Sequence, residues 1–229
     1  MERTGLPRHV GLIMDGNGRW AEKRHKPRSY GHSAGMDAMI EITKRARELN
    51  IHYLTVYALS TENLHNRPKE ELDELFNLLR KYFSRNVKEL HKRGAKVRVI
   101  GDKSPLPEDI KKLLADGENN SPPDGEFTLT FAINYGGRAE IAHAAEFLRT
   151  DGREITEESL ASVLYTEGLP EPDFIIRTGG EVRLSNFLLW QAAYAELYFT
   201  PVLFPDFSPK EFDKALAEFS NRTRRFGGI

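Results

Sequence analysis

The feature that most constrains the fold of this chain is a regular alternation of short apolar runs with segments of helical periodicity. Apolar runs of strand length occupy residues 9–14, 53–59, 96–101, 127–134, 173–179 and 195–199. Segments with helical spacing cover about residues 33–49, 68–93, 107–116, 138–149, 156–164 and 208–222. Near-continuous apolar strands that alternate with helices are typical of a parallel sheet buried on both faces. The pattern therefore predicts an α/β fold with a mostly parallel central sheet covered by helices on both faces.

The organisation of the chain is expected to be simple. Its 229 residues are enough to bury a substantial core, and the sequence contains no repeat, low-complexity linker or clear domain boundary. The most turn-rich stretch, NNSPPDG at residues 119–125, is expected to be a surface loop. We expect residues 1–229 to form a single domain.

Composition excludes several classes of function. Lys and Arg number 33 against 34 Asp and Glu, so the net charge of −1 gives no reason to expect a nucleic acid as partner. The absence of cysteine excludes disulfide scaffolds, cysteine-ligated zinc and thiol catalysis. No signal-peptide pattern opens the chain, and no run approaches the ~20 apolar residues that a membrane span needs. We expect a soluble, cytoplasmic protein with at most peripheral membrane contact.

Polar motifs follow four of the expected strands. They read DGNGRW after the first strand, STENLHNRP after the second, and NYGGR and GGEVRLSN after the later strands at 127–134 and 173–179. Ligands of open parallel sheets bind beyond the carboxyl ends of the strands. Glycine, asparagine and arginine at such ends bring backbone N–H groups and guanidinium groups close to phosphate oxygens. Each motif alone can be a plain turn or a solvated charge, but together they predict a site for phosphorylated ligands.

Two isolated carboxylates add a possible metal to this site. Asp15 ends the first apolar strand and Glu196 lies within another, where a charge is costly unless it is paired or metal-bound. The signatures of nucleotide P-loops, dinucleotide-binding turns, serine-hydrolase elbows and zinc peptidases are all absent. The pattern indicates Mg²⁺ between a carboxylate and a diphosphate, with more than one anion cradle for two phosphorylated groups. At this level DGNGRW can be a tight turn, a phosphate cradle or half of a catalytic centre.

The same motifs resemble those of a known enzyme family. HVGLIMDGNGRWA, RSYGHSAG, ALSTEN, NYGGR and IIRTGGEVRLSNFLLWQAAYAELYF are similar to the cis-prenyltransferases, the undecaprenyl diphosphate synthase-like isoprenyl transferases. The resemblance runs from about His9 to RRFGG at residues 224–228. It implies an undecaprenyl diphosphate synthase-like fold, a homodimer, and Mg²⁺-dependent condensation of isopentenyl diphosphate with an allylic diphosphate such as farnesyl diphosphate. The implied product is a (poly)prenyl diphosphate with cis double bonds, of the undecaprenyl lipid-carrier type used in cell-envelope synthesis.

The resemblance also implies roles for individual residues. Asp15 matches the aspartate that binds Mg²⁺ and promotes departure of diphosphate, with Asn17 and Asn63 assisting proton removal, and Glu196 matches a carboxylate that helps to hold the metal in the family dimer. The implied substrate-binding residues are Gly16, Asn17, Gly18, Arg19, Trp20, Arg28, His32, Ser60, Thr61, Glu62, Asn63, Arg67, Arg177, Arg183 and Ser185. The allylic diphosphate would lie at Gly16–Arg19 with Arg28 and His32, and isopentenyl diphosphate at Arg177, Arg183 and Ser185. Trp20 is expected to anchor its loop by packing, and Arg225 and Gly227 resemble a C-terminal element that reaches the partner subunit.

One departure from the family pattern leaves alternatives open. In ENLHNRP, Leu64 replaces an aromatic residue and one extra residue precedes Arg67, so the role of that arginine depends on where the gap falls. A short- or medium-chain product is therefore an alternative, as is an unusual prenyl coupling. A non-catalytic partner subunit would lack the motif residues that are intact here, and an RNA-binding module fits neither the charge nor the aromatic pattern. The apolar stripe of residues 68–93 can line a tunnel for the growing chain or can simply be core.

Overall fold

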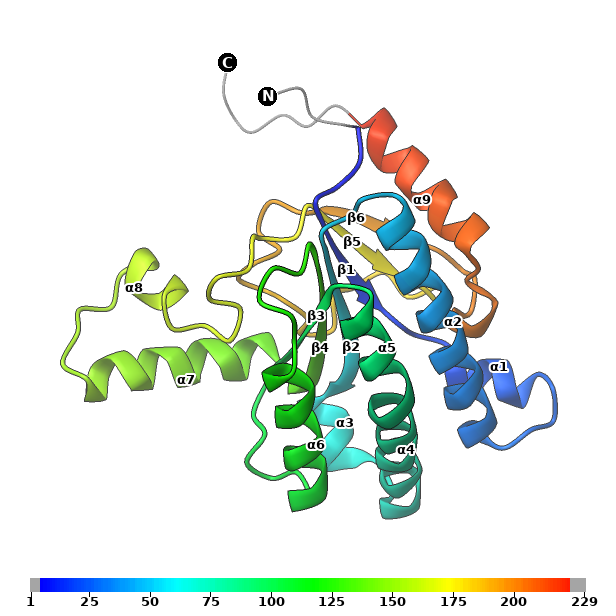
Figure 1. Cartoon of the computed structure of the whole chain (residues 1–229), viewed down its shortest axis with the longest axis horizontal. Coiled ribbons are helices and arrows are strands. Elements are labelled where there is room, and N and C mark those ends of the chain that lie inside the picture. The colour runs from blue at the N-terminus through cyan, green and yellow to red at the C-terminus, as the bar shows by residue number, and fades with distance from the viewer. Residues whose placement is uncertain (1–4, 223–229) are drawn as a thin grey trace.

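A single parallel sheet organises the computed structural model, which describes residues 5–222 (Figure 1). Within these residues the sheet has six strands in the order β3-β4-β2-β1-β5-β6, and each neighbouring pair is parallel. The strands are β1 (His9–Ile13), β2 (Tyr53–Ser60), β3 (Ala95–Ile100), β4 (Phe127–Tyr135), β5 (Phe174–Arg177) and β6 (Glu196–Phe199). The predicted parallel sheet is confirmed, and its carboxyl ends meet at one edge as the motif argument requires.

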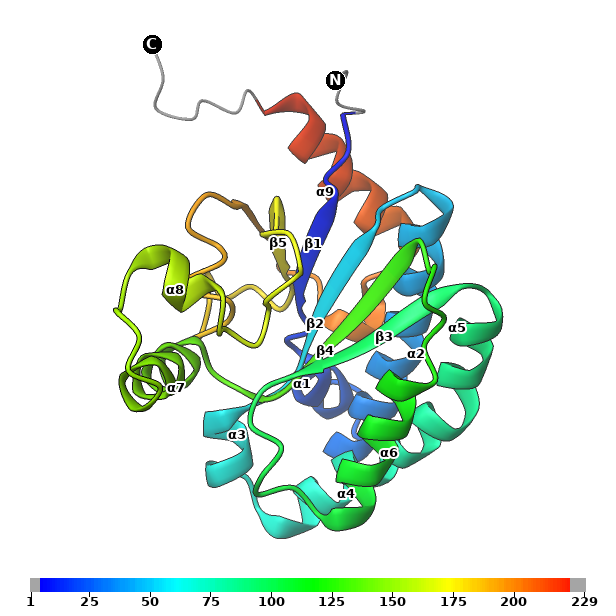
Figure 2. The ribbon, with the colours of Figure 1, turned by 60° about the vertical axis from the view of Figure 1, so that its left-hand side comes forward.

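The larger core lies on one face of the sheet. Figure 2 shows helices α2, α4, α5, α6 and α9 on this side. Their bounds are α2 (Arg28–Glu48), α4 (Lys69–Tyr82), α5 (Lys88–Lys92), α6 (Glu108–Asn119) and α9 (Pro209–Asn221). Side chains at alternate strand positions, such as Leu54 and Val56 of β2, pack against apolar helix stripes that include Phe76 and Leu79 of α4. The apolar stripe of α4 is therefore core along much of its length.

The opposite face has a different cover. Helices α7 (Gly137–Thr150) and α8 (Glu157–Ala161) lie on this side, and the irregular segment 178–195 contributes the buried Phe187 and Leu188. These two side chains pack with Ile13, Tyr135 and Ile175 in a second, smaller core. Helices cover both faces as predicted, but they are distributed unevenly, and much of the second face is covered by chain without regular structure.

Two short helices occupy segments that the motifs presented as turns or loops. Helix α1 (Asn17–Glu22) lies within DGNGRWAE, and α3 (Thr61–Asn66) follows β2 directly. Gly16 takes a φ of 107°, which directs the chain from β1 into α1, and a side chain there would also collide with Leu203. The hydroxyl of Ser60 accepts a hydrogen bond from the N–H of Asn63 and so caps α3. Such short helices have too few turns to produce a periodic pattern.

Some helix boundaries differ from those expected. Helix α2 begins at Arg28, directly after Pro27, and not near residue 33, because its first turn is polar and carries no apolar stripe. The helix expected over residues 68–93 consists of α4, a π turn at Phe83–Val87 and α5, joined without a break. The region 119–125 follows α6 as the expected loop. In residues 5–222, no helix has the length and apolar character to cross a membrane.

Candidate active site

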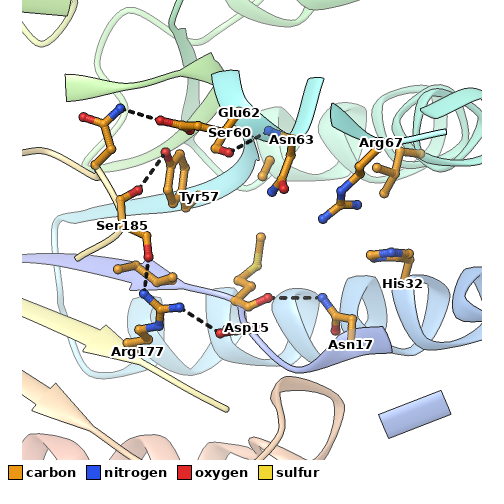
Figure 3. Close-up of a pocket in the computed structure, with 15 residues that line it drawn as sticks. Asp15, Asn17, His32, Tyr57, Ser60, Glu62, Asn63, Arg67, Arg177 and Ser185 are labelled. Atoms are coloured by element: carbon orange, nitrogen blue, oxygen red, sulfur yellow. Dashed lines mark hydrogen bonds and ion pairs between the residues drawn. The ribbon is translucent and has the colours of Figure 1, made fainter. Parts of the chain in front are cut away.

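A cavity of about 570 Å³ opens at the carboxyl edge of the sheet (Figure 3). Its lining consists of Ile13, Met14, Asp15, Asn17, His32, Tyr57, Ala58, Ser60, Glu62, Asn63, Arg67, Leu75, Arg177, Ser185 and Asn186. Ends of β1, β2 and β5, together with α3 and the segment after β5, supply most of them. Residues as far apart in the sequence as Ile13 and Asn186 thus meet at the place that the strand-end argument predicted.

The centre of one wall is an ion pair between β1 and β5. Asp15 follows β1, and its Oδ2 accepts a hydrogen bond of 2.9 Å from Nη2 of Arg177 at the end of β5. Its Oδ1 accepts another, of 3.1 Å, from Nη2 of Arg19 on α1. The side chain of Arg177 is 5% exposed and that of Asp15 is 30% exposed. Asp15 is thus the only carboxylate within ion-pair distance of the buried Arg177 among residues 5–222.

The segment after β5 wraps around Arg177. Nη1 of this guanidinium donates 2.6 Å hydrogen bonds to the carbonyl oxygen of Arg183 and to Oγ of Ser185, while its buried Nε has no hydrogen-bond partner within residues 5–222. The hydroxyl of Tyr57 donates to the carbonyl oxygens of Tyr135 and Ser185, at 3.0 and 3.3 Å. Burial raises the pKa of the Tyr57 phenol, so it stays protonated as a donor. These contacts fix Ser185 and Arg177 as one polar end of the cavity.

A second cationic cluster forms the other end. His32 of α2 and Arg67, just after α3, lie within 3.2 and 3.0 Å of Oε1 of Glu71, in the first turn of α4. Nε of Arg28 lies 3.6 Å from the same oxygen. Burial lowers the pKa of His32, and the neighbouring Arg67 lowers it further. Burial alone would raise the pKa of Glu71, but Arg67 and His32 outweigh it and the pKa is lowered, so the carboxylate is held ionised.

Close packing of α1 on α2 positions the glycine-rich motif. A Cβ on Gly31 would lie 2.0 Å from the carbonyl oxygen of Asn17, and one on Gly35 would lie 2.2 Å from Oδ1 of the same asparagine. Glycine at both positions, one turn apart on α2, therefore lets the two helices touch. Nδ2 of Asn17 donates 3.2 Å to the carbonyl oxygen of Met14, whereas its buried Oδ1 has no partner within the described chain. A Cβ on Gly18 would meet the guanidinium of Arg28, so this arginine rests directly on α1.

Helix α3 closes the cavity from above in Figure 3. Ser60, Glu62 and Asn63 line it from this side, and Glu62 accepts a 2.8 Å hydrogen bond from Nδ2 of Asn186. Arg67 lies on the same side, where it faces His32 across the cavity. Although the gap in the family pattern left its role undecided, Arg67 belongs spatially to the cluster around His32.

Several of the residues with expected roles lie off the cavity. Trp20 donates from Nε1 to Asp206 at 2.7 Å, as expected of an anchor. The guanidinium of Arg183 turns outward, where it is 60% exposed and pairs with Glu181, so only its backbone oxygen serves the site. Gly16, Gly18 and Thr61 shape the backbone around the cavity without lining it. Arg225 and Gly227 lie outside the described residues.

The two expected metal ligands are not brought together within one chain. Glu196 is in register with Phe174, which is itself in register with Val10, five residues before Asp15. Its carboxylate instead pairs with Arg222 at 3.0 Å. Within residues 5–222 no group of three or more His, Cys, Asp or Glu side chains could hold a metal ion. Of the two carboxylates that line the cavity in the described chain, Glu62 accepts a hydrogen bond from Asn186, and Asp15 lies between Arg19 and Arg177. A single carboxylate such as Asp15 fits Mg²⁺ bound by one carboxylate and by substrate phosphates.

An apolar space continues from the cavity towards the larger core. It measures about 60 Å³ and shares Met14, Asn17, His32, Ala58 and Leu75 with the main cavity. Beyond these residues it is enclosed by Gly35, Met36, Met39, Leu59, Leu78, Leu79, Phe131 and Phe204. Part of the α4 stripe therefore lines a space next to the site, and the rest is core.

Three residues that line or support the cavity are not predicted from the sequence, namely Tyr57, Asn186 and Glu71. The sequence places Tyr57 within a strand, Asn186 directly after Ser185, and Glu71 in the first turn of a helix. Acidic residues are common in first helical turns for electrostatic reasons alone. Only for Tyr57 was there a usable signal, because a polar aromatic near the carboxyl end of a strand lies where ligands bind.

Comparisons with known proteins show the family of the whole chain. The family model described as "Putative undecaprenyl diphosphate synthase" matches residues 13–227. The chain is 49% identical to an isoprenyl transferase of Streptococcus pyogenes, over 98% of this chain and 94% of the relative. It is 46% identical to isoprenyl transferase 2 of Bradyrhizobium diazoefficiens, over 100% of this chain and 93% of the relative.

Solved structures give the same result. A lavandulyl diphosphate synthase from Lavandula x intermedia, crystallised with dimethylallyl diphosphate, superposes with a TM-score of 0.94 at 37% identity, covering 99% of this chain and 100% of that one. The crystal structure of a probable undecaprenyl diphosphate synthase from Campylobacter jejuni matches with a TM-score of 0.82 at 35% identity, over 100% of both chains. With strand-end motifs, cavity and relatives in agreement along nearly its whole length, the chain belongs to the undecaprenyl diphosphate synthase family of isoprenyl transferases and is a cis-prenyltransferase.

Proposed function

We propose that this prenyltransferase condenses isopentenyl diphosphate with an allylic diphosphate, farnesyl diphosphate being the first candidate, to give a cis-prenyl diphosphate. The observation that supports this most directly is a cavity with two separate cationic ends. Arg177 with Ser185 forms one end, and Arg67, which lies beside His32, forms the other. Diphosphates held at the two ends would place their hydrocarbon parts in the same cavity, and such positioning is a large part of catalysis in a two-substrate reaction.

The chemistry demands stabilisation of negative charge at the leaving diphosphate. The bond between the allylic carbon and its diphosphate oxygen breaks, a carbon–carbon bond forms to the terminal carbon of the isopentenyl group, and a proton leaves the latter. Guanidinium groups already held in place stabilise the departing charge, and one preorganised donor is typically worth about 3–4 kcal/mol. Arg28 and Arg67 are held in this way by Glu71. The amide groups of Asn17 and Asn63, which line the cavity, would orient the acceptor of the proton.

Mg²⁺ is the cofactor we propose for the site, in keeping with the family. When bound, it would neutralise part of the diphosphate charge. Asp15 would hold it, since its carboxylate faces the cavity and is 30% exposed. Arg19 and Arg177 orient this carboxylate through both of its oxygens.

Glu196 can share that metal only across two chains. Along the strands it lies roughly 16 Å from Asp15, at about 3.3 Å per residue for the five residues of register between them. We therefore propose a homodimer in which Glu196 of one chain approaches Asp15 of the other. If Asp15→Asn and Glu196→Gln are each inactive, mixed dimers of the two should regain up to about a quarter to a half of wild-type activity. Absence of any recovery in dimers verified by subunit exchange would contradict shared sites.

Product length is the part of the proposal with two candidates. A long undecaprenyl-type chain needs more apolar room than the space of about 60 Å³ enclosed by Met39, Leu79 and Phe131, so α4 would have to move away from α2. This small space, together with the likeness to a synthase crystallised with dimethylallyl diphosphate, favours a short- or medium-chain product as the second candidate. Substituting Phe131→Ala should lengthen the product if the aromatic ring limits it.

The test is a direct assay of the purified protein. It would be incubated with radiolabelled isopentenyl diphosphate, Mg²⁺ and either dimethylallyl, geranyl or farnesyl diphosphate, and the butanol-extractable product would be separated by chromatography. We expect labelled product with at least one primer, and its length decides between the two candidates. No product with any primer would refute the proposal and would favour a non-catalytic partner subunit. We further propose that the enzyme works in the cytoplasm against a membrane surface, since its product is a lipid.

A further inference from the structure

The connection between α1 and α2 forms an exposed basic loop, residues 22–30, beside the site. In Figure 1 this loop projects from the body of the molecule beyond the end of α1. Lys23, Arg24, His25, Lys26 and Arg28 are all exposed, and the only carboxylate in the loop is Glu22. Although the whole chain has a net charge of −1, positive charge is concentrated here. A surface of this kind attracts anions locally.

Aromatic rings hold the basic loop in a fixed shape. The ring of Tyr30 stacks on Trp20 with centroids 5.8 Å apart, and Trp20 is itself tied to Asp206. The guanidinium of Arg24 lies 3.9 Å from the centroid of the Trp20 ring, and the ammonium of Lys26 lies 5.9 Å from that of Tyr30. Tyr30 nevertheless remains 50% exposed. The loop therefore presents charges and an amphipathic ring outward without first having to be ordered.

Two of these charges have no neutralising carboxylate in the part of the chain that the structure describes. Arg24 pairs with Asp206 and Arg28 with Glu22. Lys23 and Lys26, by contrast, have no carboxylate within 4.0 Å among residues 5–222. Lysines beside an exposed tyrosine are the combination that favours the headgroup region of an anionic bilayer, where the ring lies at the interface and the ammonium groups meet phosphates.

The basic loop is continuous with the cavity. Its last residues begin α2, where Arg28 rests on Gly18 of α1 and reaches towards Glu71. One turn further along α2, His32 lines the cavity itself. A surface that touched the basic loop would thus lie next to the site from which a water-insoluble product must leave.

We propose that the basic loop docks the enzyme on an anionic lipid bilayer, with Lys23 and Lys26 among the headgroups and Tyr30 at the interface. The proposal rests on the proposed function for its choice of a bilayer, because a prenyl diphosphate with a growing hydrocarbon chain passes from enzyme to lipid. Docking through this loop places the mouth of the site at the membrane.

The experiment measures binding of the full-length protein to vesicles without any turnover. Sedimentation of the protein would be compared in the presence of phosphatidylcholine vesicles and of vesicles that contain about 30% phosphatidylglycerol, both at ~0.1 M salt. The wild type should bind the anionic vesicles and leave the neutral ones. The variant Lys23→Gln/Lys26→Gln should bind roughly thirtyfold more weakly, the loss expected from two lysines near an anionic surface. The matched control Lys88→Gln/Lys92→Gln, on the exposed face of α5, should change binding less than about twofold.

The possible outcomes separate docking from other roles. Unchanged vesicle binding by the Lys23/Lys26 variant, or no binding by the wild type, would overturn the proposal. A raised KM for the allylic diphosphate in vesicle-free buffer, with vesicle binding intact, would assign the loop to substrate capture and would equally overturn it. Because binding is measured without substrates, failure of the condensation assay would remove the proposed function and leave the docking result standing. A thermal melt of each variant confirms that it is folded.

Discussion

The ion pair between Asp15 and Arg177 predicts that Asp15, for which we propose a catalytic role, is also important for stability. From the sequence alone, a metal ligand at a strand end should contribute little to the fold, so Asp15→Ala should lose turnover and keep its stability. The structure changes this expectation, because the guanidinium of Arg177 is 5% exposed and Asp15 is the one carboxylate within ion-pair distance of it in residues 5–222. Removing Asp15 leaves a buried positive charge whose Nε already lacks a partner there.

The expected magnitude follows from burial. Leaving one member of a buried ion pair uncompensated costs about 3–5 kcal/mol. Since Asp15 is 30% exposed and the cavity admits water, we expect a loss nearer to about 2–3 kcal/mol for Asp15→Ala. For a chain of this size that corresponds to a fall in melting temperature of about 4–12 °C. Asp15→Asn, which keeps a hydrogen-bond acceptor, should lose less stability but about as much turnover, roughly 10²–10³-fold.

Melting temperatures and urea-unfolding curves of four variants test this reasoning. Arg177→Met removes the charge itself, so in the double variant Asp15→Ala should cost much less than alone, with a coupling of about 1.5–3 kcal/mol. The control is Asp109→Ala, which breaks a pair with Arg80 of 2.7 Å in which the aspartate is 58% exposed, and it should lower the melting temperature much less than Asp15→Ala does. If Asp15→Ala melts within ~1 °C of the wild type, the carboxylate does not neutralise Arg177 and the reasoning is refuted.

Three further predictions concern packing, pH and substrate charge. Gly31→Ala places a Cβ against the backbone oxygen of Asn17 and should lower the free energy of unfolding, measured in urea, by about 3 kcal/mol. Gly35→Ala should displace only the side chain of Asn17 and mainly reduce turnover. Equal losses of stability in the two variants would contradict this reasoning. Burial lowers the pKa of His9 from its ordinary value of 6.5 to about 4 in the folded chain. Between these two pH values the unfolded chain binds a proton that the folded chain does not bind. Wild-type stability should therefore fall by about 3 kcal/mol between pH 7 and pH 4 from this group, and His9→Gln should remove that part of the fall in urea titrations; an unchanged pH profile would exclude the effect. Glu71→Gln should bind inorganic diphosphate severalfold more tightly, as measured by calorimetry, because Arg28 and Arg67 lose the carboxylate that neutralises them. Weaker binding would show that Glu71 positions these arginines and does not compete with the ligand.

The sheet and the position of the site could be predicted because both follow from short-range patterns. Parallel strands are buried on both faces, so they appear as continuous apolar runs, as in the fully buried β4. Once the strands are parallel, their carboxyl ends share an edge, and polar motifs after β1, β2 and β5 must converge there. This reasoning needs no knowledge of side-chain contacts, and it brought Asp15, Ser60 and Arg177 to one cavity.

The short helices and the cover of the second face could not be predicted in the same way. Helix α1 forms because Gly31 and Gly35 let it pack on α2, a contact between segments that no local periodicity records. The segment 178–195 has no regular structure, yet it buries Phe187 and Leu188 against the sheet. Both features depend on tertiary packing, which routinely overrides local preference.

The counter-ions of the site explain why residue types alone predict the site only in part. The motifs identify cations, but an arginine at a strand end says nothing about which carboxylate neutralises it. In the structure Asp15 neutralises Arg177, and Glu71 lies between His32 and Arg67, at the end where we propose that a diphosphate binds. Without substrate, a carboxylate of the protein therefore neutralises each cationic end, which limits repulsion between buried charges. At the end formed by Arg67, binding of a diphosphate would then exchange Glu71 for another anion, and the affinity would measure the difference between the two anions rather than the attraction of the cations alone.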